Sequence, residues 1–261
     1  MNEFIKNAAD ILSNCPGRAG ACFSWNGEWL EVGSSDVFSS ASLIKLPILL
    51  TAFRMSEKGA LDLKEMVKLR DVEKTGGAGV LQALSEDAVL SVQDLLTLMI
   101  TVSDNAATNW VIEKIGMHKI NETIEGLGLV NTKLNRKMMD LDAIQSGMDN
   151  FTSPADMVRC LQAINEGDIV SEESRQMMLA ILQKQQFTDK LPYNMDKELI
   201  YAGNKTGELP GIEHDCAIIK YRDTTVYAAV MIDQFEQKEW GRKTISEVGK
   251  LIYGKLLDGQ G

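Results

Sequence analysis

Apolar residues at the start of the chain have the spacing of one helix followed by two strands. In residues 2–14 they recur at intervals of three and four, at Phe4, Ile5, Ala8, Ile11 and Leu12, which predicts an amphipathic helix. Cys15-Pro16-Gly17 ends this helix. The apolar-rich runs 19–25 and 29–32 are separated by Asn26-Gly27, a strong signal for a β-hairpin.

The middle of the chain has a helical period and the end returns to strands. Apolar residues recur every three or four positions in the segments 43–58, 92–102, 106–115, 118–127, 154–165 and 172–183. Glycines and Asn/Asp clusters separate these predicted helices. After Pro192 the period falls to about two in residues 199–202, 214–221 and 225–232, and residues 240–257 close the chain as a helix.

The order of these elements predicts an α/β (α+β) architecture built from both ends of the chain. Two strands near the start and three near the end form a five-stranded sheet, and the helical block is inserted between them. We expect residues 1–41 and 187–261 to form this sheet domain and residues 42–186 to form an all-helical domain. A chain of 261 residues is long enough for one large domain or two closely joined ones.

Composition and charge indicate which kinds of molecule the protein is expected to bind. The chain is 44% hydrophobic and 25% charged, which is ordinary for a soluble globular protein, and its net charge is −10. Lys and Arg form no basic stripe, so we expect neither nucleic acid nor an anionic membrane as a partner. We expect a monomer that acts on a small molecule.

The first residues of the chain and its cysteines help to predict where in the cell the protein is located. No run approaches the roughly 18 apolar residues of a membrane span, and residues 1–10 lack the pattern of a secretory signal. We therefore expect a cytoplasmic protein unless a leader was removed. The cysteines have no metal-ligand spacing and are expected to be buried free thiols; they are Cys15, Cys22, Cys160 and Cys216. No metal or cofactor is expected.

Candidate chemistry begins at Ser42, where a polar run meets an apolar one. If a helix starts here, its free N–H groups and positive dipole end point at Ser42, and Lys45 follows one turn later on the same face. A Ser-x-x-Lys spacing alone is weak, because a helix cap followed by a solvated lysine explains it as well. Two later motifs change this interpretation: Ser103-Asp104-Asn105 and Lys205-Thr206-Gly207.

Together the three motifs resemble those of the class A β-lactamases and penicillin-binding proteins, which are active-site serine enzymes. The class A branch is the most similar, and the resemblance covers nearly the whole chain. It implies an antiparallel five-stranded sheet flanked by helices beside an all-helical domain. It also implies an active site in the cleft between the two.

The resemblance gives each motif a role in acyl transfer. Ser42 would be the nucleophile, Lys45 its base and Ser103 a proton-shuttling hydroxyl. A lysine with an ordinary pKa has only about one molecule in 2,500 neutral at pH 7. Lys45 therefore needs a lowered pKa, which burial and the second ammonium of Lys205 would provide.

The same resemblance assigns the substrate-binding groups. Asn105 would hold the substrate's amide carbonyl and orient Lys45. Lys205, Thr206 and Gly207 would bind the substrate, with the first two holding its carboxylate. The backbone N–H groups of Ser42 and Glu208 would form the oxyanion hole.

Lys-Thr-Gly occurs twice, and the two copies differ in context. Lys74-Thr75-Gly76 lies in a glycine-rich stretch whose composition predicts a loop. Lys205-Thr206-Gly207 ends a predicted strand and lies at a family-like distance from Ser103. We therefore assign the function to the second copy.

One part of the family pattern is absent. Residues 131–154 resemble the Ω-shaped loop that in class A enzymes carries a glutamate to activate the deacylating water. Counted from Arg136, that position is Met138, and a thioether cannot accept a proton. Asp140 or Asp142 could replace the base, as could Glu208. His214-Asp215 offers another pair, although a surface His beside an Asp is commonly incidental.

Three functions remain open at this point. The first is a serine hydrolase that is acylated on Ser42 by β-lactams or related amides and esters and turns over slowly. The others are a D-alanyl peptidase or small esterase, and a covalent β-lactam-binding or sensing module. The chain has only two histidines and contains neither Gly-x-Ser-x-Gly nor His-Glu-x-x-His. The sequence therefore supports neither an α/β-hydrolase triad nor the zinc site of a zincin.

Overall fold

The computed structural model describes residues 1–258, and its centre is a five-stranded antiparallel sheet. Strands β1 (Arg18–Trp25) and β2 (Glu28–Val32) come from the start of the chain. Strands β7 (Tyr201–Leu209), β8 (Ile212–Tyr221) and β9 (Thr224–Asp233) come from its end. The order β2-β1-β9-β8-β7 leaves β7 at one edge. The predicted five-stranded sheet from both ends of the chain is confirmed.

The predicted hairpin between the first two strands also forms. Asn26 and Gly27 have positive φ angles of 49° and 86°. A type I′ turn requires this conformation at both central residues, and Asn-Gly adopts it at little cost. The turn pairs Trp25 with Glu28 and thereby sets the register of the two strands.

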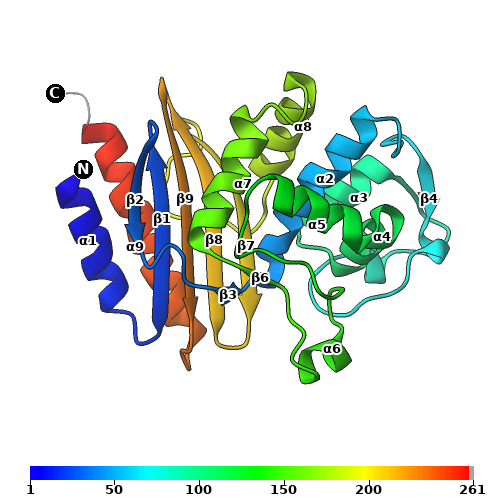
Figure 1. The fold of residues 1–261 in the computed structure, drawn as a ribbon, viewed down its shortest axis with the longest axis horizontal. Coiled ribbons are helices and arrows are strands. Elements are labelled where there is room, and N and C mark those ends of the chain that lie inside the picture. The colour runs from blue at the N-terminus through cyan, green and yellow to red at the C-terminus, as the bar shows by residue number, and fades with distance from the viewer. Residues whose placement is uncertain (259–261) are drawn as a thin grey trace.

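Helices cover both faces of the sheet (Figure 1). Helices α1 (Asn2–Ser13) and α9 (Lys238–Asp258) pack on each other and on one face. Helices α7 (Pro154–Glu166) and α8 (Glu172–Gln183) lie against the other face. The apolar side chains on this second face belong to the same core as those of the helical block.

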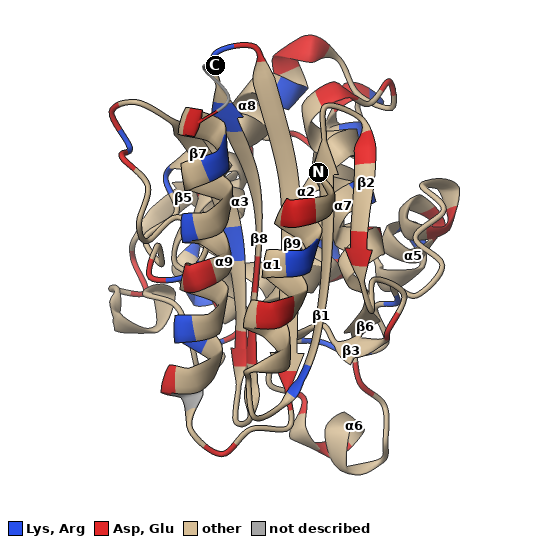
Figure 2. Ribbon diagram, turned by 90° about the vertical axis from the view of Figure 1, so that its left-hand side faces the viewer, with Lys and Arg blue, Asp and Glu red and all other residues tan. Residues whose placement is uncertain are grey.

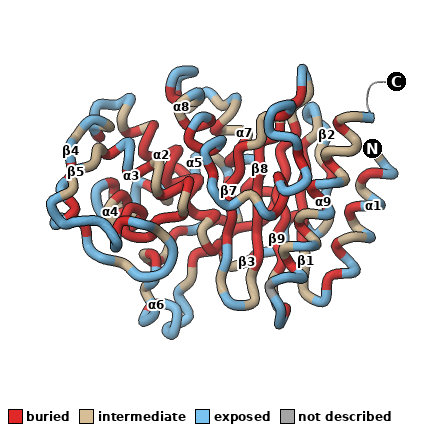
Figure 3. Tube along the Cα trace, turned by 180° about the vertical axis from the view of Figure 1, so that it is seen from behind, coloured by how far each residue is buried: buried red, intermediate tan, exposed pale blue. Residues whose placement is uncertain are grey.

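The helical block is built around α2 (Lys45–Glu57), ten of whose thirteen residues are buried. Around it lie α3 (Val92–Thr101), α4 (Asn105–Ile115) and α5 (Met117–Gly126). Figure 3 shows the α2 trace as a buried segment inside more exposed neighbours. All residues of α2 from Lys45 to Phe53 are buried, so the charged side chain at the start of this helix is buried with them.

The inserted region is not wholly helical as expected. It contains short strands β4 (Met66–Lys68) and β5 (Val89–Ser91), which pair with each other, and β6 (Phe151–Thr152), which pairs with β3 (Phe38–Ser39). A short helix α6 (Leu141–Gln145) was also not predicted. Segments of two to five residues are too short to show a period, so the spacing of apolar residues cannot reveal them.

The outer surface carries both signs of charge. Figure 2 shows Lys and Arg interspersed with Asp and Glu along α1 and α9, with no stripe of one sign. Among residues 1–258, no helix combines the length and the apolar content that a membrane span requires. All four cysteines are free and buried, as the sequence predicts.

Candidate active site

Ser42 lies in a single 3₁₀ turn, Ala41–Ile44, that leads directly into α2. The predicted helix start is therefore a tighter turn followed by the α-helix. Ala41 has a positive φ of 44°, an uncommon conformation for a residue with a Cβ. Such backbone strain persists where surrounding packing imposes it, and it often marks functional sites.

Close packing of β7 holds this turn in place. A Cβ added to Gly207 would lie 3.2 Å from the Cβ of Ala41 and 3.2 Å from the carbonyl oxygen of Ser40. A side chain at position 207 would push the strand edge away from the turn. Gly207 therefore brings the edge of the sheet next to Ser42.

Lys45 is completely buried at the start of α2, one turn after Ser42. Its Nζ donates to the carbonyl oxygen of Ser103 at 2.7 Å, to Ser103 Oγ at 2.9 Å and to Asn105 Oδ1 at 2.9 Å. Burial, assisted by the charge of Lys205, holds the pKa of Lys45 well below its usual value. The expected lowering of this pKa is thus present for the expected reasons.

Ser103 lies between the two lysines. Its Oγ accepts from Lys45 Nζ at 2.9 Å and from Lys205 Nζ at 3.1 Å, and its φ is positive at 54°. Lys205 is also fully buried, and desolvation lowers its pKa to about 7. A hydroxyl held between two amines can relay a proton between them.

The loop that contains the first Lys-Thr-Gly copy forms hydrogen bonds with Asn105 and Asp104 of the second motif. Asn105 Nδ2 donates to the carbonyl oxygen of Gly76 at 3.0 Å, which fixes the direction of the Asn105 amide. Asp104 accepts from the backbone N–H groups of Val80 and Leu81 at 2.7 and 2.9 Å. The Lys74 ammonium itself points to Glu86, at 2.7 Å, on the exposed surface. Sequence reasoning missed this supporting role of the loop.

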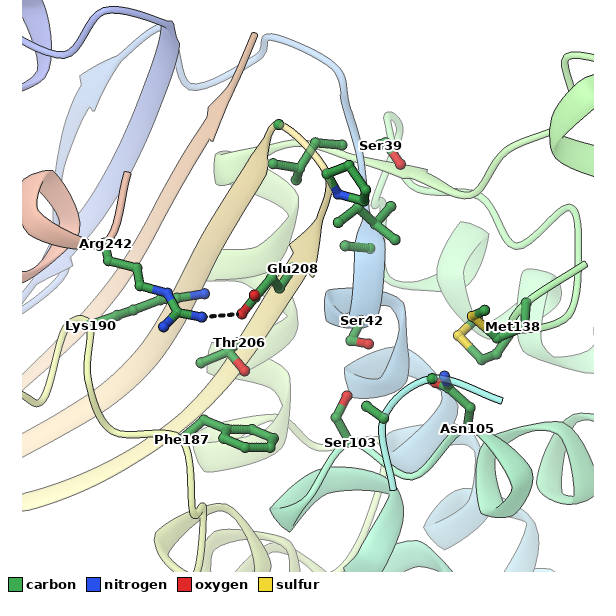
Figure 4. A pocket seen from close by; sticks show the side chains of 18 of the residues that line it. Ser39, Ser42, Ser103, Asn105, Met138, Phe187, Lys190, Thr206, Glu208 and Arg242 are labelled. Atoms are coloured by element: carbon green, nitrogen blue, oxygen red, sulfur yellow. Dashed lines mark hydrogen bonds and ion pairs between the residues drawn. The ribbon is translucent and has the colours of Figure 1, made fainter. Parts of the chain in front are cut away.

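Thr206 and Glu208 follow Lys205 on the edge strand β7 and line the same cavity as Ser42, Ser103 and Asn105. Figure 4 shows these side chains from the sheet and from the helical block facing one another across it. The edge strand pairs with another strand, β8, on one side only, so its other side is left to contact the turn of Ser42 and to line the cavity. The structure thus brings the three sequence motifs together.

Met138 also lines the cavity, on the side formed by the Ω-like loop. Its backbone is fixed from both ends: the N–H donates to Asn109 Oδ1 at 2.7 Å and the carbonyl oxygen accepts from Asn109 Nδ2 at 3.1 Å. The Met138 side chain is therefore held near the reacting groups and is only 7% exposed.

The two aspartates considered as substitute bases are not brought to this cavity. Asp140 caps α6, where its Oδ1 accepts from the backbone N–H of Ala143 at 3.0 Å. Asp142 is exposed on the same short helix. Neither belongs to the cavity lining, and the Glu208 carboxylate is held by Arg242 at 2.6 Å.

His214 and Asp215 are both fully buried, so the expectation of a surface pair is wrong. His214 accepts from the backbone N–H of Ile232 at its Nδ1 and donates from Nε2 to the carbonyl oxygen of Ser39 at 2.9 Å. Desolvation lowers its pKa to about 4. Desolvation raises the pKa of Asp215 to about 7. Strand β8 is an interior strand of the sheet, between β9 and β7, and this position accounts for the burial.

The cavity has a volume of about 1510 Å³ and extends well beyond the motifs. Its wall includes the apolar side chains of Met139, Leu141 and Phe187, as well as Lys190 and Arg242. These residues belong to loops, to α6 or to α9 and carry no motif, so the sequence gives no signal for them. Arg242 places a guanidinium beside Glu208, with Nη2 2.6 Å from Oε2.

Comparisons with known proteins agree with this geometry. A family model described as the beta-lactamase enzyme family matches residues 3–256. Beta-lactamase BRO-1 of Moraxella catarrhalis is 22% identical over 237 residues, which cover 87% of this chain and 76% of that protein. The crystal structure of a beta-lactamase from Sphaerobacter thermophilus has a TM-score of 0.90 and 30% identity, covering 97% of each chain.

A second structure, PBP-A, has a TM-score of 0.88 and 28% identity, covering 99% of this chain and 97% of that one. A point mutant of PBP-A has the same TM-score and identity, and its structure is an acyl-enzyme complex with penicillin-G.

Proposed function

Since the chain belongs to the beta-lactamase enzyme family, we propose that it forms an acyl-enzyme on Ser42 with β-lactams or related amides and esters and hydrolyses that adduct slowly. The observation that carries this proposal is the buried Lys45–Ser103–Lys205 network beside Ser42. Two lysines with lowered pKa values and a shared hydroxyl are costly to bury, and acyl transfer gives them a use.

Acylation would proceed by proton transfer among these groups. Neutral Lys45 takes the proton of Ser42 Oγ, which attacks the β-lactam carbonyl carbon and forms the C–O bond. The backbone N–H groups of Ser42 and Glu208 hold the negative oxygen of the tetrahedral intermediate. When the C–N bond breaks, Ser103 passes its proton to the leaving nitrogen and is reprotonated from the lysines.

Deacylation lacks an evident base. The Met138 side chain, buried at the cavity wall, is aliphatic apart from its thioether and cannot take a proton from water. Losing a positioned general base typically slows a step by about 10² to 10⁴-fold. We therefore expect acylation to be faster than hydrolysis of the adduct.

The experiment is to mix the protein with nitrocefin or a fluorescent penicillin and to follow both the product and the intact mass. The expected result is an adduct of one acyl group per chain that forms quickly and decays slowly. Ser42→Ala should form no adduct. A wild-type protein that forms no adduct with either compound would contradict the proposal.

A covalent binding or sensing module is the second candidate, and the same observation about Met138 favours it. The two functions differ in turnover: repeated product release with a transient adduct indicates a lactamase, and a persistent stoichiometric adduct indicates the binding module. A D-alanyl peptidase or esterase is tested with D-alanyl dipeptide and small ester substrates under the same conditions.

A further inference from the structure

Lys190 lines the cavity but takes no part in the proposed proton transfers. It follows α8 in the chain, and its side chain is only 1% exposed. The Nζ forms an ion pair with Glu213 and donates to the carbonyl oxygens of Gly207, at 3.4 Å, and His214, at 3.2 Å. An ammonium has three protons, so these acceptors use its whole donor capacity.

The two carbonyls belong to residues that face each other on β7 and β8, because Gly207 pairs with His214. The carbonyl of Gly207 lies in the same peptide group as the N–H of Glu208, the proposed oxyanion donor. In a planar trans peptide the C=O and the N–H point in opposite directions. The Gly207 carbonyl oxygen accepts from Lys190, so the N–H of Glu208 is on the opposite side of the peptide group from the oxygen that Lys190 contacts.

A positive charge near a carbonyl oxygen polarises the whole peptide group. Electron density shifts toward the oxygen, and the N–H becomes a stronger donor, by about 10–30% per bond in condensed-phase estimates. The Glu213 carboxylate offsets part of this charge, but it is shared with Arg242, whose Nε donates to Glu213 Oε1 at 3.1 Å. Figure 4 shows Lys190 and Arg242 together beside Glu208, with the Arg242–Glu208 contact marked.

We propose that Lys190 is a positioning residue for acylation: it fixes and polarises the peptide between residues 207 and 208, so that the Glu208 N–H binds the oxyanion more strongly. This inference rests on the proposed function. It differs from a purely structural role, in which Lys190 would only neutralise Glu213 and hold the loop after α8 against the sheet.

The test uses two variants. Lys190→Met combined with Glu213→Gln removes the ammonium without leaving an unpaired buried carboxylate. Glu213→Gln alone keeps the ammonium and removes its counter-ion. For each folded protein the acylation rate with a penicillin and the stretching frequency of the acyl-enzyme ester carbonyl are measured, the latter by isotope-edited infrared spectroscopy.

The double variant should acylate about tenfold more slowly, a fraction of the roughly 10²-fold or greater loss on deleting an oxyanion donor. Its ester carbonyl should absorb at a higher frequency than in the wild type, because the hydrogen bond is weaker. Glu213→Gln alone should shift the frequency the other way, since the charge of Lys190 is then less compensated.

A folded double variant with the wild-type frequency and rate would overturn the proposal and show Lys190 to be structural. If the double variant does not fold, an unchanged frequency in Glu213→Gln overturns it instead. A wild-type protein that forms no adduct on Ser42 overturns the proposed function and this inference together, which separates the two failures.

Discussion

At the residue scale, the site depends on lysines that burial makes less basic. Lys45 and Lys205 are both fully buried, and their amines meet at a single hydroxyl, that of Ser103. The sequence predicts both residues and the need to lower the pKa of Lys45. It does not predict Lys190 or Arg242, because each acts through carboxylates and carbonyls that only the folded sheet brings close.

The rate of acylation should therefore be bell-shaped in pH. It should rise as Lys45 loses its proton, at a pH well below the ordinary pKa of lysine, because only the neutral amine is a base. It should fall above a pH of about 7, where Lys205 loses its charge and binds the substrate carboxylate less well. The measurement is the second-order acylation rate with a fluorescent penicillin from about pH 5 to pH 9.

Lys205→Arg is the matched control for this profile. A guanidinium stays charged throughout this range, so the falling limb should disappear while the rising limb stays. A variant that keeps the falling limb would show that another group causes it.

Met138→Glu should accelerate deacylation. The backbone at position 138 is fixed by Asn109, so a carboxylate there would lie at the cavity wall, where a water could be activated. We expect the adduct lifetime to shorten by one or more orders of magnitude, within the roughly 10² to 10⁴-fold range of a general base. Intact-mass decay after removal of excess penicillin measures it.

Met138→Gln is the control for shape, since it is similar in size to glutamate but cannot take a proton. Equal lifetimes in the Glu and Gln variants and the wild type would mean that the register of the Ω-like loop, counted from Arg136, is wrong.

At the element scale, the sequence predicts long elements well and short ones poorly. The hairpin turn Asn26-Gly27 and the helices of ten or more residues follow from local chemistry and period. The strands β3 to β6 and helix α6 have two to five residues, and tertiary pairing creates them. The burial of His214 and Asp215 on β8 could not be predicted from the sequence either, because it depends on the strands that flank β8 on both sides.

Strand β8 carries two titrating residues with opposite effects on stability. The pKa of His214 is lowered to about 4 in the folded protein. The stabilisation that neutral His214 gives to the fold is therefore present above its ordinary pKa of 6.5 and is lost as pH falls to about 4. The pKa of Asp215 is raised from 3.8 to about 7, so its contribution is present at low pH and is lost as pH rises to about 7. Between pH 4 and 6.5 the two largely cancel.

Single substitutions should reveal how each residue changes the free energy of unfolding with pH. In His214→Gln the free energy of unfolding should fall with rising pH relative to the wild type. In Asp215→Asn it should rise. Each slope has an upper limit of about 1.4 kcal/mol per pH unit. Urea unfolding at several pH values measures both, and variants that only shift stability by a constant amount would contradict this account.

At the whole-molecule scale, the sheet and the helical block share one core. Side chains of α2, α3 and α4 belong to the same apolar cluster as Cys216, Ile218 and Met231 of the sheet. The sequence predicts that the two parts exist and that the chain ends meet in one sheet. It does not predict a common core, because period identifies which face of an element is apolar but not what packs against it.

The shared core predicts a single unfolding transition. Trp25 lies on β1 in the sheet and Trp110 on α4 in the helical block, so variants that keep only one tryptophan report the two parts separately. Their fluorescence midpoints in urea should agree with each other and with the midpoint from circular dichroism. Two separated midpoints would show that the parts unfold independently.

The burial of every native thiol has a practical consequence. All four cysteines are buried, so none presents its thiol to solvent, and burial also raises the pKa of Cys22 to about 12. A cysteine introduced at the cavity rim by Tyr193→Cys, a position 66% exposed, should thus be the only one to react with a maleimide dye. Mass spectrometry should find one dye per chain, and none on the unsubstituted protein. The dye's emission would then follow antibiotic entry in real time.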